Sequence, residues 1–384
     1  MWQSWCGWCG PLDLERALAT LLPMSRSSPR PRTAVVLFNL GGPDRLESVR
    51  PFLVNLFSDP AILRVPPFIR PFLARRIAHA RLAPATENYK LLGGRSPLLD
   101  LTEAQARALE AALPERETRC FIAMRYWHPF SLEVAHAVKA SDPDEIVLLP
   151  LYPQFSTTTT GSSLIAWREA AARVGLVRPV TTICCYPDDP DFIKATTAIV
   201  RVHYEKARAA LPDGQRLRVL FSAHGLPEVI VKSGDPYQEQ VGRTVAAVVR
   251  TLALPDLDHV ICYQSRATPQ QWIGPSTDTE IERAAKDQVA VLVVPIAFVS
   301  EHTETLVELD VEYRALAERL GVPAYVRVPT QNIDPGFIAA LAGLVRRALA
   351  QGPGLCSLAA SGICSAVQRD CPQRRAGGAL AVAA

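Results

Sequence analysis

VLVVPIAF, residues 291–298, is an apolar run that leads into the polar stretch SEHTE at residues 300–304. A second apolar run, RVLF at residues 218–221, leads directly into SAHGLP at residues 222–227. Continuous apolar runs are typical of strands buried on both faces of a parallel sheet. The polar residues then lie at the carboxyl ends of the strands, where open α/β sheets bind ligands. A histidine and a carboxylate brought together there can transfer protons, hold a divalent metal ion, or do both.

Outward from these runs, apolar strands alternate with amphipathic segments from about residue 34 to residue 350. This alternation predicts an α/β fold of two similar doubly wound lobes, each a four-stranded parallel sheet flanked by helices. The predicted strands are residues 34–40, 118–124, 145–151 and 177–183 in the first lobe, and 218–223, 259–263, 289–296 and 324–328 in the second.

Four segments follow from this pattern. Residues 1–32 are expected to be a disordered extension or the result of a start codon placed too far upstream. Residues 33–187 form the N-terminal lobe, and residues 188–350 form the C-terminal lobe that carries both polar stretches. The boundary falls in the turn-forming segment 186–190, which is rich in Pro and Asp. Residues 351–384 are expected to be a flexible tail that contains cysteines.

Composition excludes several classes of protein. The formal net charge is only +3, and no block of like charges occurs, so we expect no nucleic-acid partner. No apolar stretch reaches the roughly 20 residues that span a bilayer. The nine cysteines are odd in number and scattered, which argues against a secreted disulfide framework and for a reducing cytoplasm. We therefore expect a cytoplasmic protein, and leave open whether it associates with a membrane.

Residues 51–82 differ in character from the rest, because they mix apolar side chains with prolines and a run of arginines. One interpretation is a helical cap over the sheet. The other is an exposed apolar lip with a basic rim, suited to a large flat amphiphile or to peripheral contact with a membrane surface. The sequence leaves both interpretations open.

Nine short motifs occur in one order along the chain. They are NLGGP at 39–43, GGRSP at 93–97, RYWHP at 125–129, YPQFS at 152–156, TTGSS at 159–163, SAHGLP at 222–227, YQSR at 263–266, WIGP at 272–275 and PIAFVSEHTETL at 295–306. Through these motifs, from about residue 34 to residue 350, the chain resembles the ferrochelatase family. The resemblance implies an enzyme that inserts Fe(II), its metal substrate, into a porphyrin and releases two protons, as the terminal step of haem biosynthesis.

By this resemblance, His224 faces the centre of the porphyrin as proton acceptor, metal ligand, or both. Glu304 is its acid–base partner or the second metal ligand across the cavity. On one helix, Glu301, Glu304 and Glu308 would stack along a single face. With His302 and Asp310 nearby, they would form a path for protons or metal, and the alternative is a solvated acidic stripe. Which of His224 and Glu304 holds iron stays open.

The resemblance also implies a set of side chains around the porphyrin. They are Leu40, Tyr89, Arg125, Tyr126, Ser156 and Trp272, with Arg95 and Ser96 as further candidates. We expect Arg125 to pair with a propionate, because guanidinium groups bind carboxylates in bidentate fashion. Leu40 stands where family members that use coproporphyrin carry a tyrosine, which favours protoporphyrin IX as the partner molecule. Monomer and homodimer both remain open.

Some members of the family carry a 2Fe-2S cluster, and here Cys356, Cys364 and Cys371 lie in the tail. Animal members supply a further cysteine where this chain has Thr157. A fourth thiolate would then come from Cys120, Cys184 or Cys185. The alternative is a flexible tail with incidental thiols.

Two other functions remain as alternatives at this stage. One is a cobalt or nickel chelatase on the same kind of fold, which would act on a more carboxylated tetrapyrrole and need more basic residues around its cavity. The other is a carrier that binds haem or metal without catalysing insertion.

Overall fold

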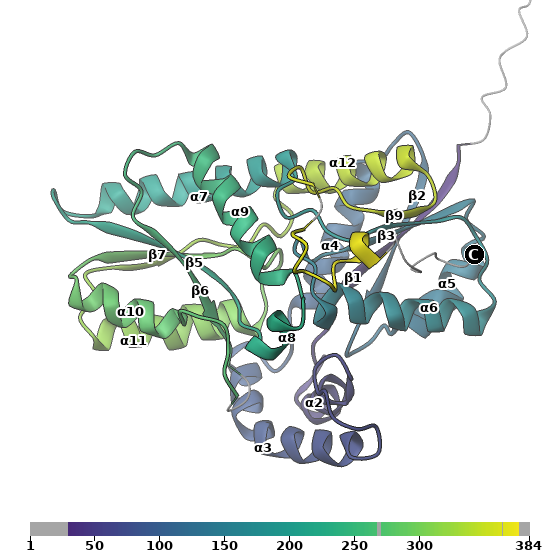
Figure 1. Ribbon diagram of the computed structural model, residues 1–384, viewed down its shortest axis with the longest axis horizontal. Coiled ribbons are helices and arrows are strands. Elements are labelled where there is room, and N and C mark those ends of the chain that lie inside the picture. The colour runs from purple at the N-terminus through teal and green to yellow at the C-terminus, as the bar shows by residue number, and fades with distance from the viewer. Residues whose placement is uncertain (1–29, 267–269, 363, 376–384) are drawn as a thin grey trace, which may run out of the picture.

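The computed structural model describes residues 30–266, 270–362 and 364–375. Most of the predicted extension 1–32, with Cys6 and Cys9, therefore lies outside the described residues, as does the end of the tail from residue 376. Two parallel sheets stand side by side, with helices packed on their faces (Figure 1). The predicted α/β fold of two doubly wound lobes is confirmed.

The N-terminal sheet has five strands in the order β2-β1-β3-β4-β9. The strands are β1 (Arg32–Asn39), β2 (Glu117–Met124), β3 (Glu145–Pro150), β4 (Val180–Ile183) and β9 (Gly354–Cys356). The helices of this lobe include α4 (Leu98–Ala111), α5 (Ser131–Ser141) and α6 (Ser162–Val174), which follows the π-helical turn η3 (Thr157–Gly161). Four of the five strands lie where the sequence predicts them.

The C-terminal sheet has the predicted four strands, in the order β6-β5-β7-β8. They are β5 (Leu217–His224), β6 (His259–Gln264), β7 (Ala290–Pro295) and β8 (Tyr325–Arg327). Helices α7 (Pro190–Ala210), α8 (Glu228–Lys232), α9 (Tyr237–Leu252), α10 (Thr277–Lys286) and α11 (Tyr313–Arg319) belong to this lobe, together with the π-helical segment η4 (Glu304–Glu312). The last long helix, α12 (Pro335–Gln351), follows β8.

The fifth strand of the first sheet comes from the tail, which was expected to be flexible. β9 pairs in parallel with β4, in the register Thr181↔Gly354 to Ile183↔Cys356. Without β9, β4 would be an edge strand with unpaired backbone groups. A helical turn, α13 (Pro372–Arg375), follows. The described part of the tail is thus built into the N-terminal sheet, and a three-residue strand was too short to show in the sequence pattern.

The two lobes share one hydrophobic core. Val35 and Leu37 of β1 belong to the same cluster of buried side chains as Val219 and Phe221 of β5. Helices α7 and α12 pack on one another along the upper side of the molecule in Figure 1, and α12 also packs on α4, β3 and β4. The predicted C-terminal lobe therefore ends in a helix that covers the N-terminal sheet.

Gln105 reinforces this joint between the lobes. It lies on α4 and is fully buried. Its Nε2 donates to the carbonyl oxygens of Val299, at 3.2 Å, and Asn332, at 2.9 Å. The Ser300 hydroxyl donates to its Oε1 at 3.0 Å. A helix of the first lobe thus fixes the segment that leads from β7 to Glu304.

Residues 51–82 project from the two sheets as α2 (Val49–Ser58) and the start of α3 (Arg70–Leu91), below the junction of the lobes in Figure 1. Phe52, Leu53 and Phe57 are buried in a cluster of their own. Phe68 and Phe72, in contrast, are 83% and 71% exposed. One face of the segment packs on residues that follow β1 and β2, among them Leu40 and Tyr126, and its tip is apolar and exposed; contact with an amphiphile or a membrane stays a prediction. No helix in the described ranges is long and apolar enough to cross a bilayer.

Candidate active site

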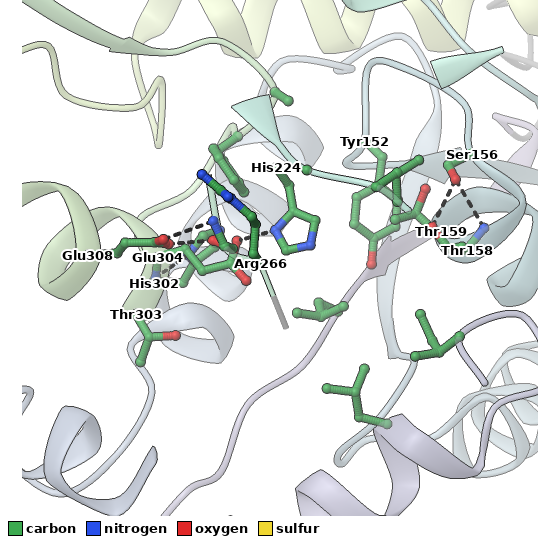
Figure 2. Close-up of a pocket in the computed structure, with 18 of the residues that line it drawn as sticks. Tyr152, Ser156, Thr158, Thr159, His224, Arg266, His302, Thr303, Glu304 and Glu308 are labelled. Atoms are coloured by element: carbon green, nitrogen blue, oxygen red, sulfur yellow. Dashed lines mark hydrogen bonds and ion pairs between the residues drawn. The ribbon is translucent and has the colours of Figure 1, made fainter. Parts of the chain in front are cut away.

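A cavity of about 610 Å³ lies between the lobes and the α2–α3 segment. Its floor comes from the carboxyl ends of strands in both sheets, as the sequence predicts. Its apolar walls include Leu40, Leu53, Leu56, Phe57, Ile62, Leu63, Ile77, Leu226, Trp272 and Phe298. The polar lining is gathered around His224 and Glu304 on one side and around Tyr152, Ser156 and Thr158 on the other (Figure 2). The volume is in the range of pockets that bind organic ligands.

His224 and Glu304 are in direct contact, so the expectation that Glu304 lies across the cavity from His224 is wrong. His224 is the last residue of β5, and Glu304 is the first residue of η4, which follows the neighbouring strand β7. The imidazole Nδ1 is 2.9 Å from Glu304 Oε2. The other ring nitrogen, Nε2, points away from Glu304 toward the side of the cavity that holds Tyr152 (Figure 2). One ring nitrogen is therefore occupied by the carboxylate, and the other is turned toward a bound ligand.

The pair shifts the pKa values of both groups. Burial lowers the pKa of His224, but the charge and hydrogen bond of Glu304, together with the charge of Glu308, raise it overall above its ordinary value. Burial raises the pKa of Glu304, but the charge and hydrogen bond of His224 outweigh this effect and bring that pKa to about 2. Glu304 is therefore ionised at neutral pH and stabilises the protonated imidazole.

Glu308 lies one turn further along η4, and the YQSR motif holds its carboxylate. It accepts hydrogen bonds from Gln264 Nε2, at 2.9 Å, from the Ser265 backbone N–H, at 2.8 Å, and from the Ser265 hydroxyl. Burial and the charge of Glu304 raise the pKa of Glu308. Two carboxylates on one helix thus have pKa values displaced in opposite directions, which is the usual basis for division of acid and base roles.

A family model described as Ferrochelatase matches residues 32–349. The chain belongs to the ferrochelatase family. The ferrochelatase of Caulobacter vibrioides (strain NA1000 / CB15N) is 52% identical over 347 residues, which cover 89% of this chain and 98% of that protein. The ferrochelatase of Phenylobacterium zucineum (strain HLK1) is 53% identical over 345 residues, or 87% and 98%.

The solved structure of SirB from Bacillus subtilis with Fe3+ superimposes with a TM-score of 0.50, covering 84% of this chain and 96% of that one. At 13% sequence identity, this likeness concerns the fold alone. The family is one of metal chelatases that insert a metal ion into a porphyrin for haem synthesis, so this chain is a metal chelatase.

In this ferrochelatase-family enzyme, the expected path of acidic residues is arranged differently from the sequence interpretation. Glu301 precedes η4, and its Oε1 accepts from Arg327 Nη1 at 2.5 Å and from the Thr330 backbone N–H at 2.9 Å. Asp310 pairs with the same guanidinium, from Arg327 Nε at 2.9 Å. Glu301 and Asp310 therefore neutralise the partly buried Arg327, while the carboxylates that line the described part of the cavity are Glu304, Glu308 and Glu312.

His302 lines the cavity beside the His224–Glu304 pair. Its Nδ1 accepts a hydrogen bond from the Glu304 backbone N–H at 3.0 Å. Burial lowers the pKa of His302 despite the carboxylates nearby. This imidazole is therefore neutral at physiological pH, and it fixes the first residue of η4.

Of the side chains expected around the porphyrin, Leu40, Ser156 and Trp272 line the cavity. Arg125 does not line it within the described chain. Its Nη2 pairs with the buried Asp59 at 2.9 Å, and its Nε donates to the Ser162 hydroxyl at 2.6 Å. The arginine thus ties the end of α2 to the start of α6.

Tyr126 and Tyr89 are buried beneath the cavity wall. The Tyr126 hydroxyl donates to Asp59 at 2.8 Å. The Tyr89 hydroxyl hydrogen-bonds the side chain of Thr303, and burial raises its pKa. Tyr89 therefore touches the segment that carries Glu304, and it supports the cavity without forming its surface.

Two cationic side chains that the sequence analysis did not single out line the cavity, Arg81 of α3 and Arg266 after β6. Arg266 also pairs with Asp278 at 3.0 Å. Arg81 belongs to the run of arginines in residues 51–82, and nothing in that run distinguishes it. Arg266 ends the YQSR motif, whose position after a strand was a usable signal.

The tail cysteines converge on the end of β4. The Cys184 backbone N–H donates to the Cys356 carbonyl at 2.9 Å, and the sulfur atoms of Cys184 and Cys185 are 3.6 Å apart. The hydrogen bond with Cys185, burial, and the nearby thiols of Cys356 and Cys371 all raise the pKa of Cys184. Cys364 and Cys371 hydrogen-bond one another through their side chains.

All five of these cysteines are buried. Cys120 stands apart from them, because β2 is at the opposite edge of the sheet from β9. In the described part of the chain, no group of three or more His, Cys, Asp or Glu side chains is arranged to hold a metal ion.

Replacing Glu304 by Gln should lower the pKa of His224. The substitution removes the charge that raises this pKa, so the opposing effect of burial is less compensated. An NMR titration of the His224 ring protons measures the change, and Glu312→Gln, which alters an exposed carboxylate on the same segment, is the matched control. An unchanged or higher pKa in Glu304→Gln would contradict the electrostatic account of the pair.

Proposed function

We propose that this chelatase inserts Fe(II) into protoporphyrin IX to give protohaem, with release of two protons, in the terminal step of haem biosynthesis. The observation that carries the proposal is the His224–Glu304 contact at 2.9 Å, at the edge of a largely apolar cavity. Insertion requires a base for the pyrrole N–H protons and a weak donor for the incoming ion. A neutral imidazole with a fixed carboxylate behind it can serve in both roles.

The free Nε2 of neutral His224 accepts one pyrrole proton, releases it to solvent or to the acidic lining, and then accepts the second. Ionised Glu304 holds Nδ1–H and stabilises the imidazolium each time. Glu308 and Glu312 continue the acidic lining away from His224. We assign the path for protons or metal to Glu304, Glu308 and Glu312, with His302 beside them. Glu301 and Asp310 support it indirectly, because Arg327 neutralises them. Oxygen donors bind Fe(II) weakly compared with thiolates, which suits delivery.

The lining also supports protoporphyrin as the substrate. In the described part of the cavity wall, Arg81 and Arg266 are the cationic side chains. Two guanidinium groups suit a ring with two propionates better than a more carboxylated tetrapyrrole. Ser156 adds a hydroxyl, and Leu40 presents no oxygen to the metal. These features favour this function over a cobalt or nickel chelatase that acts on a corrin precursor.

Anaerobic incubation with Fe(II) should quench the fluorescence of protoporphyrin IX faster than that of coproporphyrin. His224→Ala should reduce insertion by roughly a hundredfold or more, as expected for loss of a positioned base, while the Kd for porphyrin stays within a few-fold. His136→Ala, an exposed imidazole on α5, is the control. Porphyrin binding without insertion in the unchanged protein would indicate a carrier, and substantial turnover by His224→Ala would remove this residue from the mechanism.

We further propose that the cysteines beside β4 bind a 2Fe-2S cluster. Five buried thiols from three segments supply enough sulfur donors, but in the described part of the chain they are not grouped as a metal site, so binding a cluster requires the tail to shift. Cys356, Cys364 and Cys371 would supply three thiolates, and Cys184 or Cys185 the fourth. When bound, the cluster would cross-link the tail to β4 and stabilise the N-terminal sheet.

Protein purified anaerobically should then contain two iron and two acid-labile sulfide per chain and absorb visible light. Cys371→Ser should lose the absorption and the sulfide, whereas Cys120→Ser, on the far edge of the sheet, should keep both. Colourless, sulfide-free protein with normal activity would contradict the cluster.

The exposed apolar tip of residues 51–82 supports peripheral contact with a membrane. Phe68, Ile69 and Phe72 are exposed together, and Arg75 and Arg76 lie exposed on the next turn of α3. Apolar side chains beside cationic ones bind the interface of anionic bilayers. We propose that this tip touches the bilayer from which an amphiphilic porphyrin enters the cavity.

The protein should therefore co-sediment with vesicles that contain phosphatidylglycerol more than with pure phosphatidylcholine vesicles. Phe68→Ser/Phe72→Ser should abolish most of this binding, because it removes the two largest exposed apolar groups of the tip. Ile165→Ser, which alters an exposed apolar residue on α6, should not. Equal binding by all three proteins would contradict the assignment.

A further inference from the structure

A buried amide joins the tail cysteines to the wall of the cavity. Gln240 lies on α9 and is fully buried. Its Oε1 accepts a hydrogen bond from the Phe155 backbone N–H at 2.7 Å. Its Nε2 donates to the sulfur of Cys364 at 3.1 Å. One side chain thus touches both the tail and the loop that follows β3.

The chemistry of the partners fixes the orientation of this amide. A backbone N–H can only donate, so the oxygen of Gln240 must face Phe155. The NH2 group must then face Cys364, whose sulfur acts as acceptor. A sulfur that is alkylated or lost is a poorer partner for this NH2 group, whereas a thiolate is a stronger one. The side chain therefore responds to the chemical state of Cys364.

The loop that Gln240 holds forms part of the cavity. Gln154 and Ser156, on either side of Phe155, both line it. The next turn of α9 anchors the same loop, because Gln154 Nε2 donates to Thr244 Oγ1 at 2.9 Å. Ser156 Oγ in turn donates to the buried Asp235 at 3.0 Å. Phe155 itself packs against Cys184 and Cys185.

We propose that Gln240 is a positioning residue that couples the bonding state of Cys364 to the Gln154–Ser156 wall of the porphyrin cavity. With the sulfur in place, the amide is held at both ends and the Phe155 N–H is fixed. When Cys364 is removed or blocked, the amide keeps its contacts with the Phe155 N–H and the Cys185 thiol but loses its bond to the tail, and this wall becomes less ordered. That the cavity binds a porphyrin rests on the proposed function. The coupling between Cys364 and the Gln154–Ser156 wall does not depend on it.

Hydrogen exchange read by mass spectrometry tests the coupling without porphyrin. Cys364→Ala should raise exchange in a peptide covering residues 152–158 several-fold in the native protein. The same substitution should add little in a Gln240→Leu background, where both contacts are already lost, when all variants are compared as protein freed of iron and sulfide so that loss of a cluster does not contribute. Gln240→Glu separates the two contacts, because its carboxylate can still accept from Phe155 but cannot donate to sulfur, and it should resemble Cys364→Ala.

Glu239→Gln is the matched control. Glu239 lies beside Gln240 on α9, but its carboxylate accepts from the backbone N–H of the tail residue Ser365, at 3.1 Å, and does not touch the loop. It should leave exchange at residues 152–158 unchanged. Equal effects of Glu239→Gln and Cys364→Ala, or effects of Cys364→Ala and Gln240→Leu that multiply in the double variant, would overturn the proposal.

Porphyrin binding extends the test to the cavity. The Kd for protoporphyrin IX should rise several-fold in Cys364→Ala and no further in the double variant with Gln240→Leu. If the unchanged protein binds no porphyrin, the proposed function fails while the exchange data still decide the coupling. If porphyrin binds but its Kd is the same in all variants, the coupling does not reach the cavity and the inference is wrong.

Discussion

The hydrogen bond between His224 and Glu304 depends on the pairing of two neighbouring parallel strands. β5 and β7 are adjacent, so the residues that follow them must emerge at the same edge of the sheet. The imidazole and the carboxylate raise and lower one another's pKa because they are held in contact in a partly buried place. The surrounding features maintain this contact: Gln105 fixes the segment before Glu304, His302 holds its backbone N–H, and Gln264 and Ser265 secure the next carboxylate.

Features encoded by local pattern could be predicted from the sequence. Buried parallel strands are continuous apolar runs, so eight strands and the position of His224 at a strand end followed directly. Contacts between distant segments could not be predicted this way. Arg327, on β8, neutralises Glu301 and Asp310. No pattern in the sequence near those two residues predicts these ion pairs. Asp59 likewise pairs with Arg125, which the resemblance predicts to bind a propionate.

The start and the helix type of η4 could not be predicted from the sequence, for a different reason. The expected stacking of Glu301, Glu304 and Glu308 assumes an α-helix that begins before residue 301. The helix begins at Glu304 and is π-helical, a form that occurs mostly as short segments at functional sites. β9 could not be predicted, because three residues are too few to show an alternation of apolar and polar side chains. In both cases the tertiary surroundings, and not local propensity, decide the conformation.

The shared core has a mechanical consequence for how a flat ligand enters and leaves. Proteins that clamp a ligand between two lobes usually bend at a hinge whose lobes have separate cores. Here buried side chains of β1 and β5 belong to one cluster, and Gln105 bridges the lobes at the back of the cavity. Opening such a joint would expose apolar core to water. We therefore expect the two lobes to stay fixed relative to one another, and the α2–α3 segment, whose buried side chains form a separate cluster, to be the part of the cavity wall that can move.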